Sequence, residues 1–342
     1  MKSKRALIAM SGGVDSSVAL SLMKADGYEC EGVTMRLLNG SESGIEDAKA
    51  VARRLDVPFS VAEMVDTFRE TVIAGFIDAY EKGLTPNPCV LCNRVLKFGE
   101  LLKLADRKDC DVLVTGHYAK TEQVDGRFIL KKAADKQKDQ SYFLYSLTPE
   151  QLSRVRFPLG NYTKPEIRDI AERLGFVNAH RKDSQDICFV PGGDYARVIA
   201  EYSRKIYPEG NFVDKNGAVL GKHGGLIKYT VGQRKGLGIA LGKPMYVCAK
   251  DTAKNEVVLC DDAELFGTEL EAVDFNWIIP PKAEVLRCKA RIRYRHTEQD
   301  ATVAVLENKV KVTFDQPQRA ITPGQAVVLY DSDIVLGGGT II

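Results

Sequence analysis

The sequence predicts an α/β protein in which an N-terminal Rossmann-like parallel sheet is followed by two β-rich domains, the last of them a β-barrel. The first half alternates short β-branched runs with longer helical patterns, which is typical of a parallel sheet covered by helices. From residue 212 onward, short alternating segments are separated by turns containing glycine or proline, which favours all-β modules. The length of 342 residues agrees with two or three domains.

The first half supplies the elements of the expected sheet in order. Strands are predicted at residues 5–10, 31–35, 59–61 and 111–115. Helices are predicted at residues 16–25, 45–55, 67–82 and 93–105. Between the last two helices, Thr85-Pro86-Asn87-Pro88 indicates a non-helical loop, because proline fixes its own φ and disfavours helix in the residue before it.

Near residue 200 the sequence changes from alternating strand and helix patterns to short strand patterns separated by turns. This change, with the spacing of the later strands, divides the chain into three parts. We expect an α/β catalytic domain over residues 1–200, a small β-rich domain over 201–265 and a terminal β-barrel over 266–342. Glycines crowd positions 217–242, and Pro280-Pro281 marks a further joint.

Composition excludes several classes of protein. The chain has 48 Lys+Arg against 46 Asp+Glu, a net charge of +2, which argues against a general nucleic-acid coat and leaves room for a local basic patch. No apolar run is long enough to span a membrane, and the first residues reach glycines too early for a secretory signal. We therefore expect a cytoplasmic protein whose eight cysteines start out reduced.

The segment Ser11-Gly12-Gly13-Val14-Asp15-Ser16-Ser17 lies between the first predicted strand and the first predicted helix. Glycines let backbone amides converge, and the helix N-terminus adds partial positive charge, so an anion is favoured there. Asp15 can help to position Mg²⁺. The loop differs from GxxxxGK[ST] because it has no lysine. A serine cap on a glycine turn is the simpler alternative, but the complete string favours a nucleotide site.

Three cysteines stand apart from the other five. Cys89 and Cys92 form a CxxC pair that the prolines are expected to hold in a loop entering a helix, where the helix dipole would lower a thiol pKa. Cys188 lies in Ser184-Gln185-Asp186-Ile187-Cys188-Phe189-Val190. The remaining cysteines lie in apolar, strand-like patterns that suit small core residues. A structural zinc site is disfavoured because no second CxxC is present.

These motifs resemble those of known families. SGGVDSS is similar to the loop of ATP pyrophosphatases, which cleave ATP between its α- and β-phosphates. PNPxxxCN, KDQSYFL, the cysteine of SQDICFV, YTVGQRKGLG and PGQ resemble the tRNA-specific 2-thiouridylase family from one end of the chain to the other. The resemblance implies a tRNA-uridine 2-sulfurtransferase, in which Mg²⁺ and ATP adenylate C2 of the wobble uridine and sulfur then replaces the activated oxygen.

The resemblance also implies roles for single residues. The ATP-binding positions would be Ala9, Met10, Ser11, Gly12, Gly13, Val14, Asp15, Ser16, Met35 and Gly116. The tRNA-binding positions would be Asn87, Pro88, Cys89, His117, Lys138, Asp139, Gln140, Arg293, Tyr294 and Gln325. Cys92 would be the nucleophile, and Cys188 would carry the persulfide sulfur. The expected partners besides tRNA are a sulfur-donor protein or free sulfide. Membranes and DNA are not expected partners.

One departure from the family leaves the sulfur chemistry open. Many members have an acidic residue where this chain has Cys89. Three thiolates from Cys89, Cys92 and Cys188 could bind a [4Fe–4S] cluster with one open iron. The alternative implied by the resemblance is persulfide chemistry on Cys188 with a Cys92–Cys188 disulfide, in which Cys89 takes no part.

A predicted basic strand could bind RNA. Five cations alternate over Arg287, Lys289, Arg291, Arg293 and Arg295, and a strand would present them on one face as a ribbon for phosphate.

Two alternative functions remain open at this point. A ligase or amidotransferase acting on a small metabolite would not need the cysteines. A non-catalytic tRNA-binding or iron–sulfur carrier protein would not need the complete SGGVDSS loop.

Overall fold

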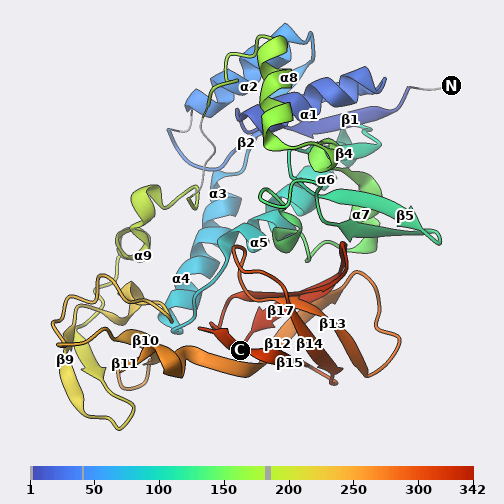
Figure 1. The fold of residues 1–342 in the computed structure, drawn as a ribbon. Coiled ribbons are helices and arrows are strands. Elements are labelled where there is room, and N and C mark those ends of the chain that lie inside the picture. The colour runs from blue at the N-terminus through green and yellow to red at the C-terminus, as the bar shows by residue number, and fades with distance from the viewer. Residues whose placement is uncertain (1–2, 41, 182–185) are drawn as a thin grey trace.

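The computed structural model describes residues 3–40, 42–181 and 186–342. Within them the strands form three sheets, of five, four and eight strands (Figure 1). The first sheet belongs to the N-terminal half, the second to the middle of the chain and the third chiefly to the C-terminal part. None of the described helices is long and apolar enough to cross a membrane.

The N-terminal sheet is parallel, in the order β3-β2-β1-β4-β7. Its strands are β1 (Arg5–Ala9), β2 (Glu29–Arg36), β3 (Phe59–Glu63), β4 (Val112–Thr115) and the short β7 (Val155–Arg156). The sequence predicted the first four of these and their parallel arrangement, so the Rossmann-like sheet is confirmed. The two-residue strand β7 was missed because two residues are too few to show the alternation of apolar and polar side chains that marks a strand.

Helices cover both faces of this sheet because its strands are apolar on both sides. On one face, Ile8 packs with α1 (Val14–Ala25), α2 (Glu42–Arg54) and α8 (Lys164–Arg173). On the other face, Leu7 packs with the helices that lead towards the rest of the molecule. Neighbouring residues of one strand point to opposite faces, so alternate positions of β1 serve two separate cores.

Two continuous helical stretches on this second face each contain a π-helical segment. The first is α3 (Val65–Phe68), η1 (Arg69–Ile73) and α4 (Ala74–Glu81). The second is α5 (Pro88–Cys92), η2 (Asn93–Glu100) and α6 (Leu101–Arg107). The predicted span 93–105 was therefore wrong at its start, because the helix begins at Pro88. Proline is well suited to the first helical position, where its missing N–H would have no partner.

The middle sheet has the order β10-β11-β8-β9, with bounds of Gly210–Val213 for β8, Val219–His223 for β9, Tyr246–Asp251 for β10 and Glu256–Cys260 for β11. Helix α9 (Tyr195–Ser203) precedes it. Phe212, Val247 and Leu259 form the centre of a small core of its own. This part is β-rich, as the sequence predicted.

The C-terminal strands close into a barrel. They are β12 (Phe266–Trp277), β13 (Val285–Arg291), β14 (Gln299–Val305), β15 (Val310–Arg319), β16 (Ala326–Asp331) and β17 (Ile334–Ile341). β12 pairs with β15 at one side and with β17 at the other, so six antiparallel strands form a closed ring. The prediction of a terminal β-barrel is confirmed.

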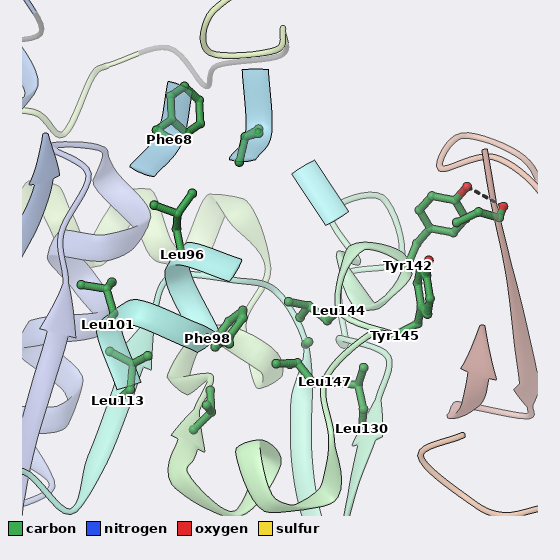
Figure 2. Close-up of a cluster of buried hydrophobic side chains, with 14 of the residues drawn as sticks. Phe68, Leu96, Phe98, Leu101, Leu113, Leu130, Tyr142, Leu144, Tyr145 and Leu147 are labelled. Carbon is green, nitrogen blue, oxygen red and sulfur yellow. Dashed lines mark hydrogen bonds between the residues drawn. The ribbon is translucent and has the colours of Figure 1, made fainter. Parts of the chain in front are cut away.

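The N-terminal part is joined to the barrel in two ways that the sequence did not predict. The hairpin β5 (Lys120–Val124) and β6 (Arg127–Lys131) extends the barrel sheet, because Lys131 pairs with Ile334 of β17. The largest hydrophobic core also continues from Phe68 and Leu101 to Tyr142 beside the barrel strands (Figure 2). The Tyr142 hydroxyl donates to the backbone carbonyl of Ala326 at 2.9 Å.

Shorter elements connect these units. They are α7 (Pro149–Arg154) and the single 3₁₀ turns at Ser141–Phe143, Pro158–Asn161, Pro191–Gly193, Leu226–Lys228 and Asp262–Leu265. The turn at Ser141–Phe143 belongs to the KDQSYFL segment and places Tyr142 in the shared core.

Candidate active site

The SGGVDSS loop connects the end of β1 to the start of α1, as predicted. Gly12 adopts a positive φ of 75°, and a Cβ atom there would lie 2.2 Å from the carbonyl oxygen of Gly44. Any other residue would therefore be strained and would collide with backbone, which no side-chain rotation can relieve. The tight turn that an anion-binding loop requires depends on this glycine.

Hydrogen bonds within the loop fix its shape. Ser16 Oγ accepts from the backbone N–H of Ser11 at 3.1 Å and lies 3.1 Å from the Gly13 carbonyl, to which it donates. Ser17 Oγ donates to the same carbonyl at 3.0 Å. From a distant segment, Asn178 Nδ2 donates to the Gly12 carbonyl at 2.9 Å. The two serine hydroxyls thus stabilise the loop as well as lying beside its amide groups.

The remaining predicted ATP residues lie at the carboxyl ends of adjacent parallel strands. Met10 follows β1, Met35 is near the end of β2, and Gly116 follows β4. A Cβ atom on Gly116 would lie 2.8 Å from the backbone nitrogen of Ser16, so the end of β4 packs directly against the first turn of α1. Ligands of open α/β sheets bind at this edge.

Asp15 is held by two side chains that the sequence reasoning missed. Lys164 Nζ lies 2.8 and 2.9 Å from its two carboxylate oxygens, and the Tyr118 hydroxyl donates to Asp15 Oδ1 at 2.8 Å. A cation therefore already stands beside this carboxylate, and carboxylate oxygen is the donor type that Mg²⁺ prefers. Asp15 fits the role of the magnesium ligand.

Cys89 and Cys92 lie three residues apart in α5, so they share one face of the helix and do not lie in the preceding loop as the sequence suggested. Cys188 lies in a turn just before the helical segment at Pro191–Gly193. All three thiols interact electrostatically with one another. The segment around Cys188 and helix α5 therefore converge, as the resemblance implied.

Desolvation by the surrounding protein governs the pKa values of these thiols, although Cys89 and Cys188 are exposed at the surface and Cys92 is half-buried. Desolvation raises the pKa of Cys89 and of Cys92, and raises the pKa of Cys188 to about 11. The Lys97 ammonium opposes that effect at each of the three thiols. The helix N-terminus alone thus does not give the lowered thiol pKa that the sequence reasoning expected.

The cysteines are free thiols throughout. All eight are unpaired, so the expected Cys92–Cys188 disulfide is not formed in this structure. Nor do the described residues contain a group of three His, Cys, Asp or Glu side chains placed to hold a metal ion. As they lie here, Cys89, Cys92 and Cys188 have the right chemistry for an iron–sulfur cluster but not the arrangement.

Lys97 and His117 connect the thiols to the phosphate loop. Lys97 Nζ is 3.5 Å from His117 Nε2, and Thr115 Oγ1 is 2.8 Å from His117 Nδ1. Burial strongly lowers the pKa of His117, with the Lys97 charge adding to that effect. His117 is therefore neutral, and its Nε2 accepts from the lysine. Because Gly116 packs on Ser16, the loop, the imidazole and the cysteines belong to one site.

The KDQ segment, by contrast, has a largely structural environment. Asp139 is buried, accepts from Ser141 Oγ at 2.9 Å and from the Ala133 backbone N–H at 3.1 Å, and lies 3.6 Å from Arg291. Burial raises the pKa of Asp139. Gln140 exchanges two hydrogen bonds with the Tyr118 backbone, and Lys138 is half-buried.

The predicted tRNA-binding residues of the barrel lie near its contacts with the N-terminal half of the chain. Arg293 Nη2 donates to the Ala320 carbonyl at 2.9 Å, and the Tyr294 ring packs on Phe143 with centroids 4.4 Å apart. Gln325 Nε2 donates to the carbonyl of Thr85 at 2.7 Å, immediately before the Pro-Asn-Pro segment with Asn87 and Pro88. The barrel thus touches the cysteine-bearing loop.

The expected basic ribbon is wrong as a strand. β13 ends at Arg291, and the chain bends at the next residues, so Arg293 and Arg295 do not continue its alternation. Arg287 makes a bidentate ion pair with Asp315, and Lys289 lies 3.5 Å from Asp300. Acidic residues from neighbouring strands neutralise these cations, a pairing that the local sequence could not reveal.

Fold and site together define a phosphate-loop α/β protein with a cysteine-bearing site beside its nucleotide loop. A family model described as a tRNA methyl transferase HUP domain matches residues 4–192. Models described as a tRNA methyl transferase PRC-barrel domain and an aminomethyltransferase beta-barrel domain match residues 197–261 and 267–341.

Full-length relatives make the assignment more specific. The tRNA-specific 2-thiouridylase MnmA of Acetivibrio thermocellus is 49% identical, with 100% of both chains covered. That of Syntrophotalea carbinolica is 48% identical, with 99% of both covered, and that of Clostridioides difficile is 47% identical, with 99% of this chain and 98% of the relative covered. The chain belongs to the tRNA-specific 2-thiouridylase family, which confirms the resemblance inferred from its motifs.

Solved structures give weaker likenesses. The U34-tRNA thiolase NcsA from Methanococcus maripaludis with its [4Fe–4S] cluster is 19% identical with a TM-score of 0.38, covering 60% of this chain and 73% of that one. A 4-thiouridine synthetase–RNA complex with bound ATP is 20% identical with a TM-score of 0.38, covering 58% and 50%.

Proposed function

We propose that this chain is a tRNA-uridine 2-sulfurtransferase, which uses ATP to convert the C2 oxygen of the wobble uridine into sulfur. The observation that carries the proposal is a series of contacts and charge interactions that joins the phosphate loop to the cysteines. Gly116 packs on Ser16, His117 follows it, and Lys97 joins His117 to the three thiols. Family membership supports the choice of tRNA uridine over a small metabolite.

The site supports activation followed by substitution. Asp15 would hold Mg²⁺, and the bound ion would neutralise negative charge on the leaving pyrophosphate. The Ser11–Ser17 loop orients the nucleotide so that the uracil C2 oxygen attacks the α-phosphate, giving an adenylated uridine and pyrophosphate. A poor leaving oxygen thereby becomes part of AMP, which departs readily when a sulfur nucleophile adds at C2.

For the sulfur step we propose the persulfide route. The terminal sulfur of a Cys188 perthiolate adds to C2, and AMP leaves with the original oxygen. The Cys92 thiolate then attacks Cys188 Sγ, forming a Cys92–Cys188 disulfide and releasing 2-thiouridine. A donor protein can supply the sulfur by passing the outer sulfur of its own persulfide to the Cys188 thiolate, and an external thiol then reduces the Cys92–Cys188 disulfide after each turnover. Free sulfide can supply it by attacking Cys188 Sγ of that disulfide, which breaks the S–S bond, releases the Cys92 thiolate and forms the Cys188 persulfide, so that no external thiol is needed. No step is assigned to a [4Fe–4S] cluster, because the three cysteines do not form a metal-binding group here.

We further propose how tRNA is held. Asn87, Pro88 and Cys89 border the extruded base, since an enzyme acting on a stacked base must flip it out. The surrounding RNA is contacted by His117, Lys138, Gln140, Arg293, Tyr294 and Gln325. Asp139 contributes indirectly, because its hydrogen bonds fix the shape of the Lys138–Gln140 segment. The divisions 1–200, 201–265 and 266–342 are proposed as the catalytic, middle and barrel domains. Because tRNA is the proposed substrate, we propose that the enzyme acts in the cytoplasm.

Purified protein whose Cys92–Cys188 disulfide has first been formed by mild oxidation, mixed with unmodified tRNA, ATP, Mg²⁺ and sulfide, tests the proposal. We expect 2-thiouridine by nucleoside mass spectrometry, with AMP and pyrophosphate released in proportion. ADP with phosphate in place of AMP with pyrophosphate would contradict the adenylation step. AMP formation that needs no RNA would instead favour a ligase of small molecules.

Iron analysis separates the two sulfur routes. After anaerobic reconstitution with iron and sulfide, we expect Cys89→Ala and the unaltered protein to be equally active and iron-poor. Stoichiometric iron and sulfide in the unaltered protein, lost together with activity in Cys89→Ala, would establish the cluster and overturn the persulfide route. Cys92→Ala and Cys188→Ala should be inactive in either case.

A further inference from the structure

Two carbonyl groups of the phosphate loop are held by side-chain donors. The Gly13 carbonyl accepts from the hydroxyls of Ser16 and Ser17, at 3.1 and 3.0 Å, within the loop itself. The Gly12 carbonyl instead accepts from Nδ2 of Asn178 at 2.9 Å, and that residue lies 166 positions away in the sequence. A carbonyl oxygen is partially negative and would repel a phosphate that it faced. The donors that hold these oxygens therefore decide which side of the loop presents amide groups.

Asn178 lies in a turn that follows α8, and packing fixes that turn. Phe176 and Ala179, on either side of it, are buried in the core that α8 shares with α1. The Arg181 backbone N–H donates to the Asn178 carbonyl at 2.9 Å, which closes the turn. Helix α8 packs along α1, the helix that begins directly after Gly13 (Figure 1). The Asn178 amide is thus brought to the loop by a well-packed part of the N-terminal half.

The orientation of the Asn178 amide follows from its partners. The Gly12 carbonyl can only accept, so Nδ2 faces it, and Nδ2 also donates to Ser17 Oγ at 2.9 Å. The residue is 3% exposed, and its Oδ1 has no hydrogen-bond partner among the described residues. A buried acceptor without a partner is rare and costs free energy. The contribution of this side chain to the loop therefore comes from its two donated bonds.

The bond to Gly12 also orients the next amide group. In a trans peptide the C=O and N–H groups point in opposite directions, so holding the Gly12 carbonyl turns the Gly13 N–H to the other side. Gly12 has a positive φ of 75°, and turns of this kind let successive backbone N–H groups converge on an anion. Without a donor at its oxygen, this peptide group could rotate and present its carbonyl to the phosphates.

We propose that Asn178 is a positioning residue of the nucleotide site, which holds the Gly12 carbonyl so that the amides of the loop face the phosphates of ATP. This inference rests on the proposed use of ATP and adds a residue that lies outside the SGGVDSS motif. Ser17 accepts from the same Nδ2 and donates to the Gly13 carbonyl, so it extends the network to the next peptide group. Asn178 acts through the loop and takes no part in bond making or breaking.

Calorimetric titration of ATP with Mg²⁺ into the full chain between pH 5 and 8 tests this role in Asn178→Asp. At pH 8 the introduced carboxylate has no proton to donate and repels the Gly12 carbonyl, so ATP binding should weaken roughly tenfold or more. Burial favours the neutral form of this carboxyl, so it takes up a proton as the pH falls, and its O–H donates to the carbonyl again. Relative to the unaltered protein at the same pH, the affinity should recover about threefold or more by pH 5.

Two charged side chains bear on the introduced carboxyl. Arg181 Nη1 lies 3.4 Å from the same Gly12 carbonyl, and Arg181 forms an ion pair with Asp47 of α2. Because Asp47 already balances the guanidinium charge, burial remains the main influence on the carboxyl. Comparison with the unaltered protein at each pH removes the titration of ATP itself from the measurement.

Matched variants separate this role from a purely structural one. Asn178→Leu is similar in size but has no donor, so it should bind ATP weakly at every pH, with no recovery on acidification. Asn216→Asp places the same carboxyl at an exposed position between β8 and β9 and should follow the unaltered protein throughout. An affinity ratio for Asn178→Asp that does not change with pH would overturn the inference, as would normal ATP binding by Asn178→Leu. Should Asn178→Leu fail to fold, Asn178→Asp decides alone, because only a proton distinguishes its two forms.

The role of Asn178 and the proposed function can fail separately. If the unaltered protein binds ATP and forms 2-thiouridine while Asn178→Asp shows no recovery at low pH, only the role of Asn178 is overturned. If the unaltered protein binds no ATP at any pH tested, the proposed function is overturned with it.

Discussion

Lys97 lies between His117, which follows the end of β4 at the nucleotide loop, and the three cysteines of the sulfur-transfer site. It is half-buried, it forms no ion pair among the described residues, and it faces His117 and the three thiols. The π-helical turn of η2 begins directly after Cys92 and brings Lys97 back towards that cysteine. Such irregular turns are frequent at functional sites.

Removing this charge should make the thiols harder to ionise. Burial already raises the pKa of Cys92, and Lys97 lowers it, so Lys97→Met shifts the pKa further upward. Less thiolate is then present at a given pH, and alkylation of Cys92 by iodoacetamide at pH 8 should slow by roughly threefold to tenfold. Peptide mass spectrometry of the alkylated protein over pH 7–10 measures the shift.

The exposed cation of the same helix provides the control. Arg94→Met should leave the alkylation profile of Cys92 where it is in the unaltered protein. A Lys97→Met profile that coincides with that control would show that the lysine charge does not reach the thiols.

At the scale of elements, the loop before α5 is clamped by the barrel. The Thr85 backbone N–H donates to the Pro323 carbonyl at 2.9 Å, and Gln325 donates to the Thr85 carbonyl at 2.7 Å. Gly324 lies between them with a φ of 90°, and a Cβ atom there would be 2.8 Å from Thr85 N. The PGQ motif therefore shapes the approach to Cys89.

Gly324→Ala should separate the two loops and lower thiolation at least tenfold while ATP binding stays normal. The added Cβ meets backbone, so one of the two chains must move. Gly242→Ala is the matched control, because it carries the same positive-φ strain of about 1 kcal/mol but meets no atom within 4 Å. Equal thiolation rates for the two variants would contradict the clamp. Hydrogen exchange over residues 84–92 should increase only in Gly324→Ala.

Elements whose signals are local were predictable from the sequence. Strand β1, the turn at Gly12 and helix α1 each follow from a short pattern, and the loop was recognised because glycine and serine types fix its chemistry. The start of α5 was missed because Pro88 reads as a breaker in sequence but lies at a first helical turn. The cations of β13 were misjudged because Asp315 belongs to another strand.

At the scale of the whole molecule, the unpredicted features are contacts between distant segments. Lys164 reaches Asp15 across 149 positions, and Gln325 reaches Thr85 across 240. The β5–β6 hairpin leaves the first domain to pair with β17 of the barrel. Periodicity and motif spacing contain no information on such pairings, so the sequence could name the ATP loop and the cysteines but not the residues that orient them.

Lys250 is one such contact, and it makes the joint between the first and middle domains sensitive to pH. Its Nζ donates to the carbonyls of Tyr229 at 3.0 Å and Leu84 at 3.4 Å, and lies 5.6 Å from the centre of the Tyr80 ring. No carboxylate pairs with it among the described residues. Burial therefore lowers the pKa of Lys250 from 10.5 to about 8.

The sign of the pH effect follows from proton binding. Between about pH 8 and 10.5 the unfolded chain holds a proton on Lys250 that the folded protein has lost, so this residue's contribution to the free energy of unfolding rises with pH across that window. Below pH 8 both states are charged and the burial penalty is constant. Relative to Lys250→Met, the unaltered protein should thus gain thermal stability from pH 8 to 10. Calorimetric melting of both proteins at matched ionic strength measures this difference, and a constant or falling difference would show that the ammonium is well solvated at the joint.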